Sequence, residues 1–175
     1  RVLIKVGDNI TTDHILPSGT HILSLRSNVP AISEYMFTAV DPAFVRRAKE
    51  WGGGFVVGGL NYGQGSSRDH AAMAPLYLGV KAILAKSYAR IHYTNLINLG
   101  IMPLTFADPD EWETLEQGDE LEISDIRAAL PAGEMLAVKN LTKEKTFQLT
   151  HGFTKRQAEI ILDGGLLSYI NRKGK

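Results

Sequence analysis

The chain has 175 residues, no cysteine, and equal numbers of basic and acidic residues, 19 of each, which is typical of one folded domain without a general attraction to nucleic acid. The absence of cysteine excludes disulfides, thiolate nucleophiles and cysteine-ligated zinc or iron–sulfur sites within this chain. Because no apolar run approaches the roughly 20 residues that span a bilayer, and because the first ten residues are too polar for a signal peptide, we expect a cytoplasmic protein with no membrane partner.

The first elements are a strand and a helix separated by a polar loop. Residues 2–6 (VLIKV) predict a short buried strand that ends at the Gly7-Asp8-Asn9 turn. The sequence TTDH at 11–14 is expected on the loop that follows. Residues 43–51 have apolar positions at helical spacing after Pro42, and they predict a helix that ends at the glycines 52–54.

The middle of the chain alternates between strands and helices. Residues 55–57 and 81–85 are short apolar runs that predict buried strands. Between them lies a glycine- and serine-rich loop, followed by an alanine-rich helix from residue 68 that we expect Pro75 to bend or end. This rhythm favours an α/β layer arrangement.

The later elements follow two patterns. Residues 89–99 predict a helix capped by Gly100, and residues 101–104 predict the next strand. The runs ELEI, MLAVKNL and KTFQL alternate as antiparallel strands do, and a last helix is expected over 154–161, ending at Gly164-Gly165. The predicted fold class is therefore α/β with a mixed sheet.

The segment from Gly63 to His70 (GQGSSRDH) has the residue types of an anion site. Glycines permit close backbone approach, and the helix that follows points its free N–H groups back at the loop. Arg68 has the planar fork that binds a carboxylate through two hydrogen bonds. A carboxylic acid substrate is therefore expected at this loop.

Three common motifs are absent from this segment. A dinucleotide-binding G-x-G-x-x-G would need glycine where Arg68 stands, and a P-loop would need Gly-Lys-Ser/Thr. A nucleophile elbow, G-x-S-x-G, would need glycine two residues after Ser66. From the residues alone, Ser66 and Ser67 fit helix caps as well as catalysts, Asp13 fits an Asx-turn, and Arg26 fits a solvated surface charge.

Three strings decide between these interpretations: TTDHI at 11–15, NYGQGSSRDHAA at 61–72, and KSYARIHYTNLINLGIMPLTF at 86–106. In this order they resemble signatures of the C-terminal swivelling domain of aconitases, and the tail QAEIILDGGLLSYI is similar to the ends of bacterial and archaeal-type members. The resemblance implies a swivelling β/β/α fold, a mixed barrel-like sheet flanked by helices. Residues 1–175 would then be one such domain, and the first residue, Arg1, leads us to expect a piece of a longer enzyme or a small subunit.

The resemblance also assigns roles to the glycine-rich loop. Ser66 matches the family's catalytic base, which removes a proton from the carbon next to a carboxylate. Gly65, Ser67 and Arg68 match the substrate-binding positions. A serine hydroxyl is a poor base unaided, so the loop must stabilise its alkoxide through N–H groups, the helix dipole and Arg68.

Two further segments receive roles in the same way. Asp13 matches an active-site acid that orients its neighbours, and His14 beside it is included among the catalytic candidates. Arg26, in LRSN, matches a second substrate-binding arginine, with one extra residue between the motifs relative to some members. The family usually has Glu after the motif arginine, where this chain has Asp69.

The resemblance implies a [4Fe–4S] cluster, held by three cysteines. Since this chain has none, we expect the cluster in a partner, either the remaining aconitase domains or a large subunit, and we expect the chain to bind no metal and to be inactive alone. The first functional interpretation is an aconitate hydratase domain acting on the tricarboxylic acids citrate and isocitrate. The alternatives are the small subunit of an isopropylmalate or homoaconitate isomerase, which more often has DTDQI at the first motif, and a non-catalytic binding module.

Overall fold

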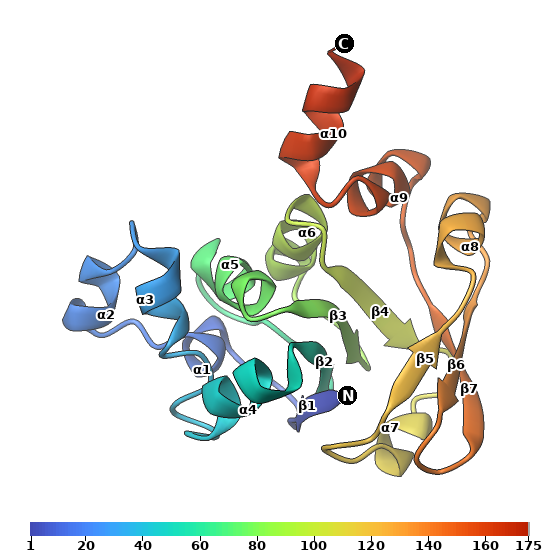
Figure 1. The fold of residues 1–175 in the computed structure, drawn as a ribbon, viewed down its shortest axis with the longest axis horizontal. Helices are drawn as coiled ribbons and strands as arrows, with labels where there is room; N and C mark the ends of the chain where they lie inside the picture. Colours follow the sequence, from blue (N-terminus) through green and yellow to red (C-terminus); the bar gives the residue numbers. More distant parts are fainter. Residues whose placement is uncertain (175) are drawn as a thin grey trace.

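A computed structural model describes residues 1–174, which form a seven-stranded mixed sheet flanked by helices (Figure 1). The strands are β1 (Val2–Lys5), β2 (Gly54–Gly58), β3 (Val80–Ala85), β4 (Met102–Phe106), β5 (Leu121–Ile123), β6 (Leu136–Asn140) and β7 (Lys145–Thr150). The helices are α1 (Thr12–Ile15), α2 (Thr20–Ser24), α3 (Val29–Ser33), α4 (Phe44–Trp51), α5 (His70–Tyr77), α6 (Arg90–Asn98), α7 (Glu111–Thr114), α8 (Ile126–Ala132), α9 (Lys155–Leu162) and α10 (Leu166–Lys173).

The strand order is β1-β2-β3-β4-β7-β6-β5, and it divides the sheet into two halves. The first four strands are parallel, and β4 then pairs antiparallel with β7, which continues antiparallel to β6 and β5. Helices α4, α5 and α6 connect successive parallel strands, as parallel neighbours require. We call residues 1–106 the parallel half and residues 107–162 the antiparallel half.

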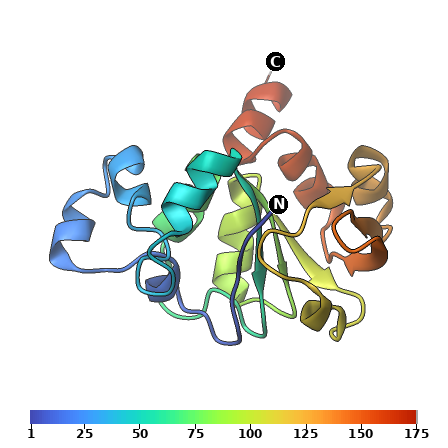
Figure 2. The ribbon, with the colours of Figure 1, turned by 60° about the horizontal axis from the view of Figure 1, so that its bottom comes forward.

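The two edges of the sheet approach each other, which explains the barrel-like character expected from the resemblance. The Val2 N–H donates to the Asp119 carbonyl at 2.8 Å, and the Gly118 N–H donates to the Val2 carbonyl at 2.8 Å. Arg1 forms an ion pair with Glu120 at 2.7 Å. The start of the chain therefore lies beside the segment that leads into β5 (Figure 2), and the mixed α/β fold predicted from the sequence is confirmed.

Two clusters of buried side chains lie on opposite faces of the parallel strands. Ile83 of β3 belongs to the cluster under α4 and α5, whereas the next residue, Leu84, belongs to the cluster shared with the antiparallel half. Both side chains are fully buried. The parallel strands are consequently covered on both faces, which explains why their sequences are continuous apolar runs.

Some expected elements differ from the observed ones. Residues 12–15, expected as loop, form the single helical turn α1, because Thr11 caps it: its hydroxyl accepts the His14 N–H, and the His14 ring accepts the Thr11 N–H. Pro75 lies inside α5 and does not end it, since the helix continues to Tyr77. A proline near the end of a short helix removes only one intrahelical hydrogen bond, and the chain tolerates that loss here.

The last expected helix is confirmed as α9, whose cap is a reciprocal pair of hydrogen bonds between Thr154 and Gln157. The chain then turns at Gly164 and Gly165 and continues into α10, which the sequence analysis did not predict. None of the helices formed by residues 1–174 has the length and the apolar character needed to cross a lipid bilayer.

Candidate functional site

The candidate site lies where β1 and β2 end at the same edge of the sheet, because parallel strands carry their following loops to one side. The loop after β1 and the loop after β2 are joined by backbone hydrogen bonds. The Gly63 N–H donates to the Ile10 carbonyl at 2.7 Å, and the Thr12 N–H donates to the Gln64 carbonyl at 2.8 Å. The Thr12 hydroxyl donates to the Ser66 carbonyl at 3.1 Å, so the TTDH and GQGSSR motifs meet in space.

Glycine is required at Gly63 for two reasons. Its φ of +85° is in the left-handed region, which side chains disfavour. A Cβ there would lie 2.2 Å from the ring of His92 on α6, so the loop backbone packs directly on that ring. Gly65 also has a positive φ, +111°, but more open surroundings. Gly63 therefore constrains the backbone path of the glycine- and serine-rich loop that it begins.

The serine loop, residues 63–68, presents a row of free donors. Among residues 1–174, the backbone N–H groups of residues 65–69 have no hydrogen-bond acceptor. These groups lie directly before the N-terminus of α5, which is the positive end of its dipole, and this arrangement favours bound anions and developing negative charge. Ser66 and Ser67 lie within this row, and both are exposed.

Arg68 is held in place by the loop after β1. Its Nη1 donates to Asp13 Oδ1 at 2.6 Å and to the Leu16 carbonyl at 3.1 Å. Ser18 donates to the same carboxylate oxygen of Asp13 at 2.6 Å. The Ser18 hydroxyl, and secondarily Arg68, lower the pKa of Asp13 below its usual range. Since the bonds of Arg68 use Nη1, its Nε and Nη2 are left to bind a carboxylate in bidentate fashion.

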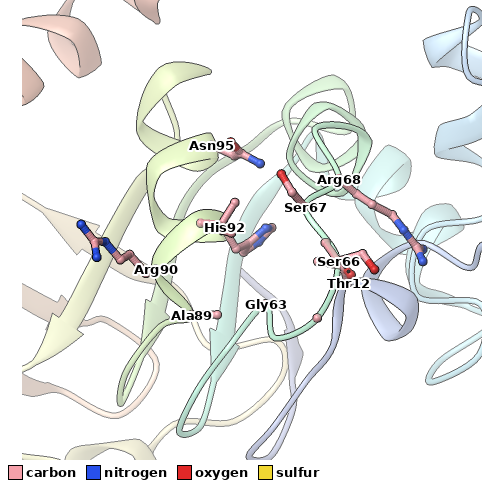
Figure 3. A pocket seen from close by; sticks show the side chains of 11 residues that line it. Thr12, Gly63, Ser66, Ser67, Arg68, Ala89, Arg90, His92 and Asn95 are labelled. Carbon is pink, nitrogen blue, oxygen red and sulfur yellow. Dashed lines mark hydrogen bonds between the residues drawn. The ribbon is translucent and has the colours of Figure 1, made fainter.

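A pocket of about 210 Å³ opens between this loop and α6 (Figure 3). The residues that line it come from α1, the serine loop and α6, and no acidic residue is among them. They are Thr12, Gly63, Gly65, Ser66, Ser67, Arg68, Ala89, Arg90, Ile91, His92 and Asn95.

Two polar side chains of α6 face this pocket without partners. His92 is 2% exposed, and neither of its ring nitrogens is hydrogen-bonded within residues 1–174. Burial lowers the pKa of His92 to about 4, so the ring is neutral at pH 7. The Nδ2 of Asn95, one turn further along α6, is likewise buried without an acceptor in the described chain. Figure 3 shows His92 and Asn95 on the side of the pocket opposite Ser66 and Arg68.

The structure brings together most of the residues that the sequence singled out. Gly65, Ser66, Ser67 and Arg68 line the pocket. Asp13 lies outside the lining and acts on it through Arg68. Whether these residues bind or convert a substrate stays a prediction.

Two predicted residues lie apart from the pocket. The ring of His14 is used to cap α1, since its Nδ1 accepts the Thr11 N–H at 3.0 Å. The side chain of Arg26 is exposed and forms no hydrogen bond or ion pair within residues 1–174, although its carbonyl lies 2.8 Å from the ring of His70. Their functional roles also stay predictions.

The site residues predicted from the sequence do not include Thr12, His92 or Asn95. The signal was present in the string RIHYTNL, because positions 92 and 95 lie on one face of a helix. A buried pair of polar residues on such a face needs polar partners. The loop that faces this pair across the pocket comes from a segment distant in sequence, which a single-sequence pattern does not reveal.

Fold and site together define a class: a small α/β domain that presents serine and arginine on a donor-rich loop at one sheet edge. The model of the aconitase C-terminal domain matches residues 31–109. The chain is 39% identical to 3-isopropylmalate dehydratase small subunit 2 of Archaeoglobus fulgidus, over 97% of this chain and 93% of that protein. It is 37% identical to a probable mitochondrial aconitate hydratase of Dictyostelium discoideum, over 97% of this chain but only 25% of that protein.

A solved structure extends the likeness to three dimensions. The 3-isopropylmalate dehydratase of Methanocaldococcus jannaschii superposes with a TM-score of 0.77 at 31% identity, covering 97% of this chain and 92% of that one. The chain belongs to the aconitase family, as the resemblance of its motifs indicated.

Proposed function

We propose that this chain supplies the serine base and the carboxylate-binding loop of a hydro-lyase that acts on a 2-hydroxy acid of the isopropylmalate class. The observation that carries the proposal is the serine loop, in which Ser66 and Arg68 adjoin a row of free N–H groups at a pocket without acidic residues. The relatives support the reaction class, since 3-isopropylmalate dehydratase small subunits match this chain at 37–39% identity over 92–93% of their own length.

This order reverses the one expected from the sequence, which put aconitate hydratase first because of the motif TTDHI. Small subunits of 3-isopropylmalate dehydratase match this chain at 37–39% identity, whereas aconitate hydratases match it at 35–37%. The pocket wall also includes the apolar residues Ala89 and Ile91, which suit a branched alkyl group better than a third carboxylate. Citrate and isocitrate remain the second candidates, because the aconitate hydratases align with nearly the whole chain.

The implied [4Fe–4S] cluster does not fit the residues of this chain. The sequence has no cysteine, and residues 1–174 contain no group of three or more His, Asp or Glu side chains that could hold a metal ion. We therefore place the cluster in a partner that carries the cysteines, and we propose that the active enzyme requires it. The cytoplasmic location stays a prediction.

The chain's own residues can perform the proton transfer. Ser66, as an alkoxide, takes the proton from the carbon next to a carboxylate, and the electron pair of that C–H bond forms the double bond as hydroxide leaves the adjacent carbon. The free N–H groups of residues 65–69 and the α5 dipole stabilise the negative charge on the serine oxygen. Arg68, oriented by Asp13, holds the substrate carboxylate and so fixes the carbon that loses its proton.

The test is a hydro-lyase assay in which this chain is mixed anaerobically with a cluster-bearing partner, with 2-isopropylmalate and citrate as parallel substrates. We expect activity only on mixing, a higher kcat/KM for isopropylmalate, and a loss of about 10²- to 10⁴-fold for Ser66→Ala. Ser124→Ala, in the antiparallel half, is the matched control and should keep full activity. A higher kcat/KM for citrate would show that citrate is the better substrate. Full activity in Ser66→Ala would refute the role of Ser66 as the base.

A further inference from the structure

The buried polar atoms behind the serine loop point to a second binding feature of the same pocket. Three of them, both ring nitrogens of His92 and the Nδ2 of Asn95, have no partner within residues 1–174. Buried side-chain polar atoms in folded proteins nearly always have one, because an unmade hydrogen bond forfeits the solvation that was lost on burial. His92 and Asn95 line one cavity, so their unsatisfied atoms are available to pair with a polar group that binds there.

The chemistry of the lining restricts what that group can be. The neutral ring of His92 donates through one nitrogen, and Asn95 donates through its amide. The serine loop adds its free backbone N–H groups, and Arg68 adds a guanidinium at the rim. Since the lining offers mostly donors and contains no carboxylate, its natural ligand is an acceptor with more than one oxygen.

We propose that His92 and Asn95 form an uncharged subsite that binds a carboxylate of the substrate by donating hydrogen bonds from α6, opposite the arginine. The inference rests on the proposed function for the identity of the ligand. It assigns a carboxylate partner inside the pocket, where the exposed side chain of Arg26 does not reach in this structure.

The same residues connect ligand binding to the geometry of the base. The ring of His92 lies so close to Gly63 that a Cβ on that residue would be only 2.2 Å from the ring. The ring of Tyr62 also packs against His92, with the two ring centroids 5.6 Å apart. A carboxylate bound to His92 is therefore bound to the ring that supports the first residue of the serine loop. Ser66 and the carboxylate are thereby held at a fixed separation.

Two variants test the subsite in the complete enzyme. His92→Phe keeps the ring that packs on Gly63 but removes both nitrogens, and it should raise KM about 10- to 100-fold while kcat changes less than about threefold. His92→Gln restores a donor and should recover part of that KM. His151→Phe, a half-buried histidine of the antiparallel half, is the control and should leave both parameters unchanged.

Ligand binding to this chain provides a readout that does not need turnover. The probes are tricarballylate and isopropylsuccinate, carboxylic acids without the hydroxyl that is eliminated, titrated into the protein while the imidazole ¹⁵N resonances are followed by NMR. We expect the His92 N–H resonance to shift on saturation, the His151 resonance to stay, and His92→Phe to weaken probe binding at least tenfold.

The outcomes separate this proposal from the proposed function. If the mixed enzyme is active but KM and probe binding are the same in His92→Phe and wild type, the subsite is refuted and the function stands. If the mixed enzyme is inactive on every acid while the probes still shift His92, the subsite stands and the function is refuted. A fall in kcat at constant KM would overturn carboxylate binding by His92.

Discussion

The parallel and antiparallel halves of the sheet differ both in how their strands are buried and in what they carry. In β3 four consecutive residues, Ala82 to Ala85, are buried, whereas in β6 buried and exposed residues alternate strictly. The first pattern arises because helices and the curled antiparallel half cover both faces of the parallel strands, and the second because one face of the antiparallel strands meets solvent. Every residue of the candidate site comes from the parallel half.

The two strand arrangements differ in which residues they can bring together at a site. Parallel strands bring successive loops to one edge, so residues 54 positions apart, such as Thr12 and Ser66, become neighbours. Antiparallel strands joined by a short turn bring together only residues that are already close in sequence. The antiparallel half therefore contributes to the core and to the closure of the sheet, and four substitution experiments test this contrast.

The largest effect is expected for a glycine under the site. Gly63→Ala introduces a side chain at a φ of +85° and 2.2 Å from the ring of His92, which should lower the free energy of unfolding by about 2–6 kcal/mol and abolish activity. Gly133→Ala, at the end of α8 with a φ of +72° and open space around it, should cost only about 1 kcal/mol and no activity. Urea unfolding of both variants measures the difference, and equal costs would contradict the role of the His92 contact.

The second effect concerns burial on both faces. Ile83→Ala and Leu84→Ala remove neighbouring side chains that are both fully buried, so each should cost about 2–5 kcal/mol. In β6 only Val138→Ala should be costly, whereas Lys139→Ala, on the exposed face, should change stability by less than about 0.5 kcal/mol. Tolerance of either substitution in β3 would show that one face of the parallel half is open.

The third effect is a pH dependence that originates in the parallel half. Because burial lowers the pKa of His92 to about 4, from an ordinary value of 6.5, the unfolded chain binds a proton there more readily than the folded one. Its contribution to stability is present above pH 6.5 and is lost as the pH falls toward 4, by up to about 3 kcal/mol. Unfolding free energies at pH 7 and 4.5 should differ less in His92→Phe than in wild type; an identical pH dependence would show that the ring is solvated.

The smallest effect on stability is expected at the ion pair beside the site. Asp13 is largely exposed, so Asp13→Asn should change the free energy of unfolding by less than about 1 kcal/mol. Activity should nevertheless fall about tenfold, because Arg68 loses the charged partner that orients it. The matched variant Glu159→Gln removes an ion-pair partner of Lys173 outside the pocket lining and should leave activity unchanged. Full activity in Asp13→Asn would contradict the role of Asp13 in orienting Arg68.

The loop residues were predictable because local rules govern them. Ser66 and Arg68 stand in a glycine-rich segment between a predicted strand and a predicted helix, and the structure has that segment at the pocket. His14 shows the opposite case. Its position beside Asp13 made it a catalytic candidate, but its ring is occupied in capping α1, an interaction that depends on whether residues 12–15 adopt helical dihedrals.

Local patterns in the sequence specify the order of the strands, the helices α4, α5, α6 and α9, the donor-rich loop, and the family to which the chain belongs, since propensity, periodicity and motif spacing act over a few residues. Long-range packing, in contrast, brings β1 close to the segment before β5 so that the sheet curls, places Asp13 against Arg68, and sets His92 against Gly63. These contacts join residues that lie 29 to 117 positions apart in the chain. Their formation depends on how the whole core packs, and no local pattern specifies that.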